Sequence, residues 1–329
     1  MTNRRRFLAG AFLLATGEPA IRRTFAATFP QGPIRLIATH PAGGQADVIG
    51  RIVAAGLARV VGQPVVIDNR PGAAGTIGAT IVARAPPDGQ TLMICSSNNL
   101  ALSRVVVRDL PYDPLRDFTL LARVAKVPTV LAVGSWLPAK TVAELVAIAR
   151  AKPGALTGAS SGTGSSSGFT LEMLKGAAGI DILQVPYAGL SPAVTALLGH
   201  QVDMVFSDFA LVAPHARAGT LRLLATPASR RFVAAPELPT LQEAGFGVVM
   251  DASVGIAAPA GLPPETLSRL ANALAEVVRS PDIRERLTSA GFEPLEDTSE
   301  QFAAAVRAEI DRITPIATRL GIAARAAKL

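Results

Sequence analysis

The sequence predicts an α/β fold of two lobes, each built on a parallel-rich sheet flanked by helices, with a cleft between the lobes. Short apolar segments alternate with segments whose apolar residues recur at helical spacing, as at residues 34–38 and then 48–60. This alternation is typical of βαβ units. The stretch after residue 253 is too short for an α/β domain of its own, so we expect it to return to the first lobe. Crossing segments near residues 125–132 and 247–256 would then form a hinge.

The first lobe is predicted from three apolar segments and the helical repeats between them. Strands are expected at 34–38, 65–67 and 92–95, with helices over 48–60 and 77–82. The Pro-Pro-Asp-Gly sequence at 86–89 is a turn signal, so the second helix should end before it.

The second lobe opens after a strand at 131–133. Thr141 and Glu144 have the spacing of a capping box, which predicts a helix that ends near residues 152–154. Further strands, with helical segments between them, are expected at 156–157, 182–183, 202–206 and 221–225. The last stretch is predicted as a strand at 254–257 and helices over 263–280, 281–290 and 299–320. The two lobes would thus comprise residues 27–130 with 254–329, and residues 131–253.

Residues 1–26 are typical of a twin-arginine export signal. Arg4 and Arg5 precede Arg6-Phe7-Leu8, and the short apolar run that follows is far below the ~20 residues of a membrane span. Small residues allow cleavage near Ala26. The alternative is a basic N-terminal tail. The export hypothesis places the mature chain outside the cytoplasm.

Composition excludes several function classes. Residues 1–26 hold five Arg and one Glu, so the net charge falls from +7 to +3 without them. The mature chain has no basic block, and the whole chain has only 15 aromatic residues, so nucleic-acid binding is not expected. Cys95, the single cysteine, lies in an apolar segment and is expected to be a buried hydrophobe rather than half of a disulfide. No cysteine near Ala26 offers a lipid anchor, and prolines interrupt the uncharged stretch 182–202, so no membrane anchor is predicted.

Two glycine-rich turns follow predicted strands, where ligands of parallel sheets bind. Glycine lets the backbone approach a ligand, and a helix N-terminus offers free N–H groups to a carboxylate or phosphate. Plain helix capping by Ser, Thr or Asp is an equally good explanation. The first turn contains Pro41, Ala42, Gly43 and Gly44, and the second contains Ser160, Ser161, Gly162, Thr163, Gly164 and Ser165.

Three ionisable residues lie close to these turns. Asp47, near a helix start, favours a capping or dipole role. Asp208 ends a predicted strand, where it could accept a hydrogen bond from a ligand hydroxyl or amine, or cap the next helix. His40 precedes the first turn and is either a ligand contact or a loop histidine.

Two enzyme-like patterns are present. Residues 164–168 match the G-x-S-x-G nucleophile elbow around Ser166, with His200 and His215 downstream, so a secreted serine hydrolase is the remote alternative. The glycines at 72–78 do not complete a nucleotide motif, and the three histidines lack metal-ligand spacing. We therefore expect no cofactor, no metal site and no catalytic residue.

Many ordered segments together resemble the extracytoplasmic receptors of tripartite tricarboxylate transporters, the Bug receptors. The resemblance spans the mature chain and rests on residues 41–44 with Asp47, 69–75, 87–92, 112–118, 138–142, 160–165, 185–187, 197–203, 219–222, 239–245 and 258–261.

The resemblance implies a two-lobed periplasmic binding protein fold of type II-like architecture that closes on a small carboxylate. Ligand contacts would come from the two glycine-rich turns and from Asp47, Ala74, Ser97, Tyr187 and Asp208. The receptor would be periplasmic and would deliver its ligand to the membrane subunits of the transporter. A receptor that presents its ligand to a signalling partner is the alternative.

The chain departs from the family pattern around the cleft. Phe169 and Gln184 stand where histidine is frequent, Ala188 where lysine is common, and residues 250–253 lack the usual tryptophan. These differences leave the ligand's identity open without affecting the expected fold.

Overall fold

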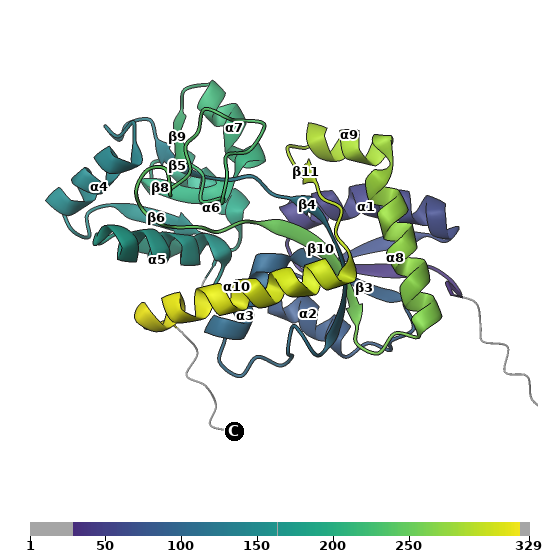
Figure 1. Cartoon of the computed structure of the whole chain (residues 1–329). Helices are drawn as coiled ribbons and strands as arrows, with labels where there is room; N and C mark the ends of the chain where they lie inside the picture. The colour runs from purple at the N-terminus through teal and green to yellow at the C-terminus, as the bar shows by residue number, and fades with distance from the viewer. Residues whose placement is uncertain (1–28, 163, 323–329) are drawn as a thin grey trace, which may run out of the picture.

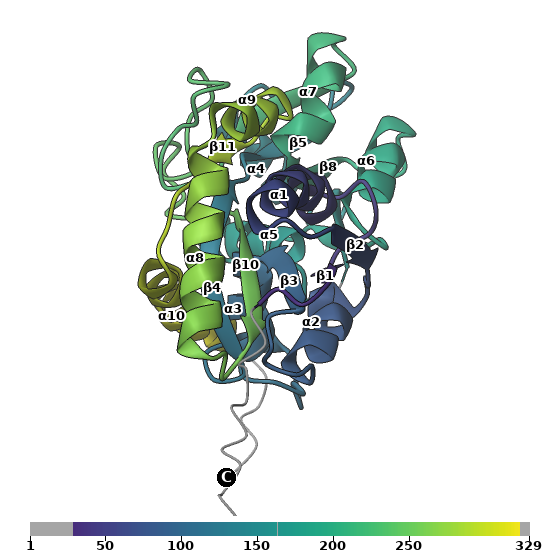
Figure 2. The same ribbon diagram turned by 90° about the vertical axis from the view of Figure 1, so that its right-hand side faces the viewer.

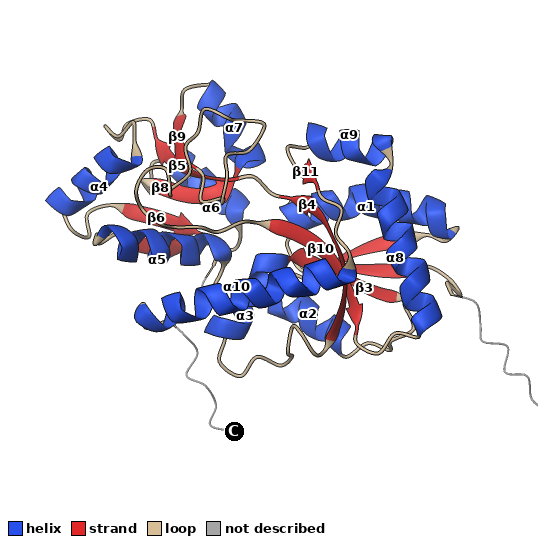
Figure 3. Cartoon of the chain, in the orientation of Figure 1, coloured by secondary structure: helices blue, strands red, loops and turns tan. Residues whose placement is uncertain are grey.

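The computed structural model describes residues 29–162 and 164–322, without the side chains of residues 97–99 (Figure 1). The predicted export signal, its cleavage near Ala26, and Thr163 lie outside the described residues. The described chain forms two sheets, each with helices packed against it (Figure 3).

The first sheet is built from both ends of the chain. Its strand order is β11-β4-β10-β3-β1-β2. The strands are β1 (Ile34–Ala38), β2 (Val65–Asn69), β3 (Thr91–Ser96), β4 (Phe118–Lys126), β10 (Ser253–Pro259) and β11 (Glu293–Pro294). The accompanying helices are α1 (Gln45–Val61), the 3-10 turn η1 (Ala73–Gly75), α2 (Thr76–Ala83), α3 (Ser97–Val106), α8 (Pro264–Arg279), α9 (Pro281–Ser289) and α10 (Ser299–Arg319).

The second sheet uses the middle of the chain, in the order β7-β6-β8-β5-β9. Its strands are β5 (Thr129–Gly134), β6 (Thr157–Ser160), β7 (Leu183–Pro186), β8 (Met204–Asp208) and β9 (Leu221–Ala225). Its helices are α4 (Val142–Ala151), α5 (Ser166–Ala178), α6 (Leu190–Leu198) and α7 (Phe209–Arg217). Thr141 caps α4 by accepting a hydrogen bond from the Glu144 N–H, as predicted, whereas the Glu144 carboxylate accepts from the N–H of Lys140.

Both sheets are mixed, which corrects the prediction that they are parallel-rich. β1 pairs in parallel with β2 and β3, but β10 runs antiparallel to β3 and β4. In the second sheet β6 pairs in parallel with β7 and β8, while β5 runs antiparallel to β8 and β9. The antiparallel pairs involve β4, β5 and β10, the strands next to the segments where the chain passes between the lobes. β4 leads directly into β5, and β10 follows the return from the second sheet.

Helices cover both faces of each sheet, because successive side chains along a strand point to opposite faces. In the first sheet Leu36 and Ile94 face the core under α1, α8 and α9, while Ile37 and Met93 face α2, α3 and α10 (Figure 2). In the second sheet one face packs against α6 and α7 and the other against α4 and α5. This layering leaves the loops at the strand ends free to form a site.

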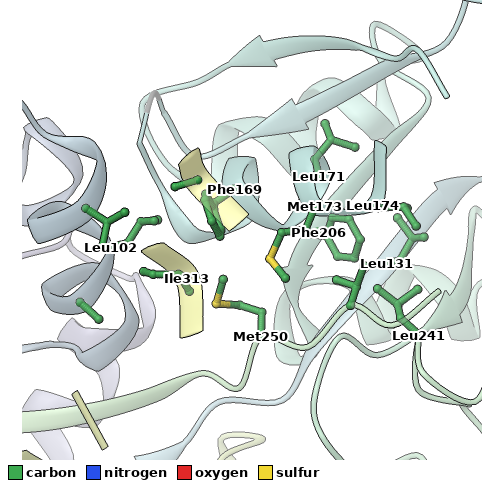
Figure 4. Close-up of a cluster of buried hydrophobic side chains, with 14 of the residues drawn as sticks. Leu102, Leu131, Phe169, Leu171, Met173, Leu174, Phe206, Leu241, Met250 and Ile313 are labelled. Atoms are coloured by element: carbon green, nitrogen blue, oxygen red, sulfur yellow. The ribbon is translucent and has the colours of Figure 1, made fainter. Parts of the chain in front are cut away.

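One hydrophobic cluster is continuous between the two sheets. Leu102 of α3, Phe169 of α5, Met250 of the returning segment and Ile313 of α10 are buried within it (Figure 4). α10 begins on the first sheet and extends beneath α5 of the second lobe, as Figure 1 shows. The two lobes therefore share apolar contacts as well as two chain crossings.

Candidate functional site

The first glycine-rich turn joins β1 to α1 and is closed by its own backbone. The Gly44 N–H donates to the Pro41 carbonyl at 3.0 Å, and a Cβ at Gly44 would lie 3.0 Å from that oxygen. Gly43 adopts a φ of 78°, a left-handed conformation that glycine takes at little cost. A Cβ at Gly43 would meet nothing within 4 Å, so this backbone is open to an approaching group.

Asp47 holds this turn from within α1. Its carboxylate accepts hydrogen bonds from the Gly43 N–H at 2.9 Å, from Asn69 Nδ2 at 2.9 Å and from Arg51 Nε at 3.1 Å. Burial alone would raise the pKa of Asp47, but these hydrogen bonds and the Arg51 charge together lower it below 3.8. Asn69 also donates to the His40 carbonyl at 3.2 Å. Asp47 therefore positions the turn.

The first turn brings little positive charge to the site. Arg51 is paired with Asp47 at 2.9 Å. Burial lowers the pKa of His40 from 6.5 to about 4, so its imidazole is neutral at pH 7. An anion bound at this turn would be held by backbone N–H groups and by the positive end of the α1 dipole.

The second glycine-rich turn joins β6 to α5 through a network of serine hydroxyls. Ser165 caps α5, since its Oγ accepts from the Gly168 N–H at 3.3 Å and donates to the Gly162 carbonyl at 2.7 Å. Ser167 Oγ accepts from the Ser161 N–H at 2.9 Å. The buried Ser160 Oγ accepts a hydrogen bond from Gln184 Nε2 at 2.9 Å. These serines therefore stabilise the turn, as the capping interpretation expects.

Ala74 lies in a strained turn beside the end of β1. Ala73 and Ala74 have φ values of 46° and 53°, a left-handed conformation that costs ~1–2 kcal/mol for each residue with a Cβ. A Cβ at the adjacent Gly75 would lie 3.3 Å from the Cβ of Thr39, so this turn packs against the start of the β1–α1 turn. Backbone strain of this kind is often found at ligand sites.

Asp208 ends β8 and is the most unusual carboxyl group near these turns. It is 6% exposed, stands at the N-cap position of α7, and makes no capping hydrogen bond, which is contrary to the capping alternative. Within the described residues its carboxyl has no hydrogen-bond or ion-pair partner. Burial raises its pKa from 3.8 to about 7. Since Ala159 pairs with Val205, the parallel register places Asp208 beside the turn that follows Ser160.

The structure brings turns of the two lobes against each other. A Cβ at Gly189, in the turn between β7 and α6, would lie 3.8 Å from Cγ of Pro41. A Cβ at Gly164 would lie 3.4 Å from Cγ2 of Val106 in α3. Tyr187 joins the second turn by donating its N–H to the Ser160 carbonyl at 2.9 Å. Ser97 begins α3 directly after β3, at the same edge of the first sheet.

Gln45 is a polar residue at the site that the sequence analysis did not single out. It is the first residue of α1, directly after Gly44, and its Oε1 is buried without a hydrogen-bond partner in the described chain. A polar side chain at the first helical position after a glycine-rich turn was the only signal that could have identified it.

The serine-hydrolase constellation is not assembled. His200 precedes β8, at the sheet edge opposite Asp208, and its ring stacks on Trp136 at a centroid distance of 3.8 Å. His215 lies in the last turn of α7. No hydrogen bond joins Ser166 to either histidine within the described residues.

Metal ligands, membrane-spanning helices and grooves outside the glycine-rich turns are further features to consider in the described part of the chain. Across residues 29–162 and 164–322 no three His, Cys, Asp or Glu side chains gather as metal ligands, and no helix has the length and apolarity of a membrane span. Cys95 is buried in β3, as predicted, and burial raises the pKa of its thiol to about 12. Two surface grooves, of about 500 and 1420 Å³, are lined by residues that belong to neither glycine-rich turn.

Comparison with known proteins decides the family. The model of the "Tripartite tricarboxylate transporter family receptor" matches residues 49–322. The chain belongs to this receptor family. It is therefore a solute-binding receptor and not an enzyme, and the resemblance inferred from the sequence motifs is confirmed.

Relatives and solved structures match the receptor over nearly its whole length. Protein BugT of Bordetella pertussis is 33% identical over 97% of this chain and 98% of its own. A Rhodopseudomonas palustris protein solved with adipate is 34% identical, with a TM-score of 0.84 over 90% of this chain and 99% of that one. MatC from the same organism, solved with bound malate, is 30% identical, with a TM-score of 0.81 over 88% and 99%. These structures confirm the two-lobed binding-protein fold.

Proposed function

We propose that this receptor captures a small carboxylate in a cleft between its lobes and delivers it to the membrane component of a tripartite tricarboxylate transporter. The observation that carries the proposal is that two glycine-rich turns, each leading into a helix N-terminus, come from different lobes and each approach the opposite lobe, Pro41 at Gly189 and Gly164 at Val106. Helix N-termini hold anions through unpaired N–H groups. Adipate and malate, found with two similar receptors, are small dicarboxylates of this kind.

The proposed contacts divide by role. The backbone of residues 41–44 and 160–165, with Ala74, Ser97 and Tyr187 beside them, would surround the ligand's carboxylate. Asp47 contributes by fixing the first turn. Asp208 would contact the distal part of the ligand, because its carboxyl is buried at the same sheet edge without a partner among the described side chains. A ligand whose distal part carries a hydroxyl or ammonium group would supply the hydrogen bond that Asp208 lacks.

The decisive experiment blocks the first turn with a matched control. Gly43 and Gly62 flank the two ends of α1, have φ values of 78° and 70°, and have no atom within 4 Å of an added Cβ. Gly43→Leu and Gly62→Leu should therefore cost similar stability, ~1–2 kcal/mol each. In calorimetric titrations with a panel of mono-, di- and tricarboxylates, only Gly43→Leu should lose binding, by more than tenfold. Equal affinities of the two variants would contradict the proposed site.

We also propose that the receptor is periplasmic and is exported through residues 1–26. Its family works in that compartment, and Arg4 and Arg5 supply the twin-arginine pattern. Replacing both arginines by lysine should retain the precursor in the cytoplasm, as cell fractionation would measure. Periplasmic protein whose N-terminal residue is still Met1 would contradict cleavage near Ala26.

A further inference from the structure

A second surface feature lies on the first lobe and is lined by residues outside the glycine-rich turns. It is a groove of about 1420 Å³ between the end of α3, the segment 107–116 that follows it, and one side of α10. α3 and α10 lie side by side along it (Figure 1). None of its lining residues belongs to the proposed carboxylate site.

Four arginines, Arg104, Arg108, Arg116 and Arg307, line this groove, and all are exposed. Arg104 approaches Asp113 at 3.5 Å. Within the described residues the other three have no ion pair. The lining carboxylates are Asp109 and Asp113, so the groove carries an excess of positive charge.

The floor of the groove is apolar. Val105 and Tyr112 are buried beneath it, and Leu110, Leu115 and Ile310 are partly exposed along it. A groove lined by both apolar and cationic side chains complements a chain that presents carboxylates and apolar side chains together. Arginine forms paired hydrogen bonds with carboxylates, which gives such a surface directional specificity.

We propose that this groove is a docking surface for an acidic, amphipathic segment of a partner protein. Asp and Glu side chains of the segment would pair with Arg108, Arg116 and Arg307, and its apolar side chains would cover Leu110 and Leu115. A bilayer surface is too flat to reach a recessed floor. The receptor's own C-terminal residues bring Arg325 and Lys328, which have the wrong charge for the groove. This inference does not rest on the proposed carboxylate site.

The test uses a fluorescent helical peptide with glutamates on one face and leucines on the other. Its anisotropy is measured against the mature receptor, against Arg108→Glu/Arg307→Glu, and against the control Arg84→Glu/Arg217→Glu, which reverses two exposed arginines outside the groove. The groove variant should bind the peptide at least tenfold more weakly, and the control should bind it as the unmodified receptor does. A peptide of equal charge with serine in place of leucine should also bind at least tenfold more weakly.

Two results would overturn the proposal. One is equal loss of peptide binding in the groove and control variants, which would indicate unspecific charge attraction. The other is binding to phosphatidylglycerol vesicles, lost only in the groove variant, without peptide binding, which would assign the groove to a lipid surface. Carboxylate affinity measured on the same samples should stay unchanged, and this result separates the groove from the ligand site.

Discussion

Replacing Asp208 by asparagine should stabilise the empty receptor above neutral pH. Burial raises the pKa of Asp208 from 3.8 to about 7, so the folded protein keeps a proton that the unfolded chain releases. Stability therefore falls as the pH rises from 3.8 to about 7. Because a pKa difference of one corresponds to about 1.4 kcal/mol, the full penalty above pH 7 is about 4 kcal/mol. The neutral amide of Asp208→Asn escapes this penalty.

Urea denaturation of the ligand-free protein between pH 4 and pH 8 measures this effect. The two proteins should have similar stability at pH 4, and Asp208→Asn should gain up to about 4 kcal/mol at pH 8. Asp203→Asn is the control, because the Asp203 carboxylate accepts hydrogen bonds from the Thr157 N–H and Oγ1, at 2.8 and 2.9 Å, and should lose stability when neutralised. A stability difference between Asp208→Asn and the unmodified receptor that does not change with pH would refute the reasoning.

Two further substitutions, and a binding assay of Asp208→Asn, test the ligand site and the fold that supports it. Asn69→Ala removes the hydrogen bonds to Asp47 and to the His40 carbonyl. Carboxylate affinity measured by calorimetry should therefore fall about tenfold, and urea denaturation should show a loss of ~1–2 kcal/mol of stability. Unchanged affinity would contradict the role of Asn69 in positioning the first turn. Gly255→Ala should destabilise by ~1–3 kcal/mol in the same assay, because its Cβ would clash with the Phe302 ring, whereas full stability would show that α10 can shift. Asp208→Asn should weaken ligands with a distal ammonium at least tenfold relative to those without one, and equal weakening would remove Asp208 from the distal contact.

The periodic elements of the fold were predictable from the sequence. β1 and β9 have the predicted bounds, and α1, α2 and α8 lie where the apolar repeats indicated. Each of these helices buries one face and each of these strands is largely buried, so the spacing of apolar residues along the sequence matches the buried positions in the fold.

β4 and α3 were not predicted, and their sequences explain why. β4 carries Arg123 and Lys126 among apolar residues, and the charge of Arg123 is paired with Asp297, which is distant in the sequence. α3 follows β3 at Ser97 without any intervening turn residue. The antiparallel direction of β10 depends on a return from the second sheet, which no local pattern encodes.

The sequence predicted the positions of the two turns of the candidate site more accurately than the contacts of its side chains. Glycine and serine patterns identified both turns because their conformations require these residues locally, as at Gly43 and Ser165. The hydrogen bond from Asn69 to Asp47 depends on packing between distant segments, and so does the lack of a partner for Asp208 among the described residues. For this reason they become visible only in the folded chain.

The most direct test of the central claim is native mass spectrometry of the receptor isolated from the periplasm, followed by denaturing release of any bound molecule. We expect one small mono-, di- or tricarboxylate per chain, retained by Gly62→Leu and absent from Gly43→Leu. A bound molecule without a carboxylate, or a covalent adduct on Ser166, would contradict it.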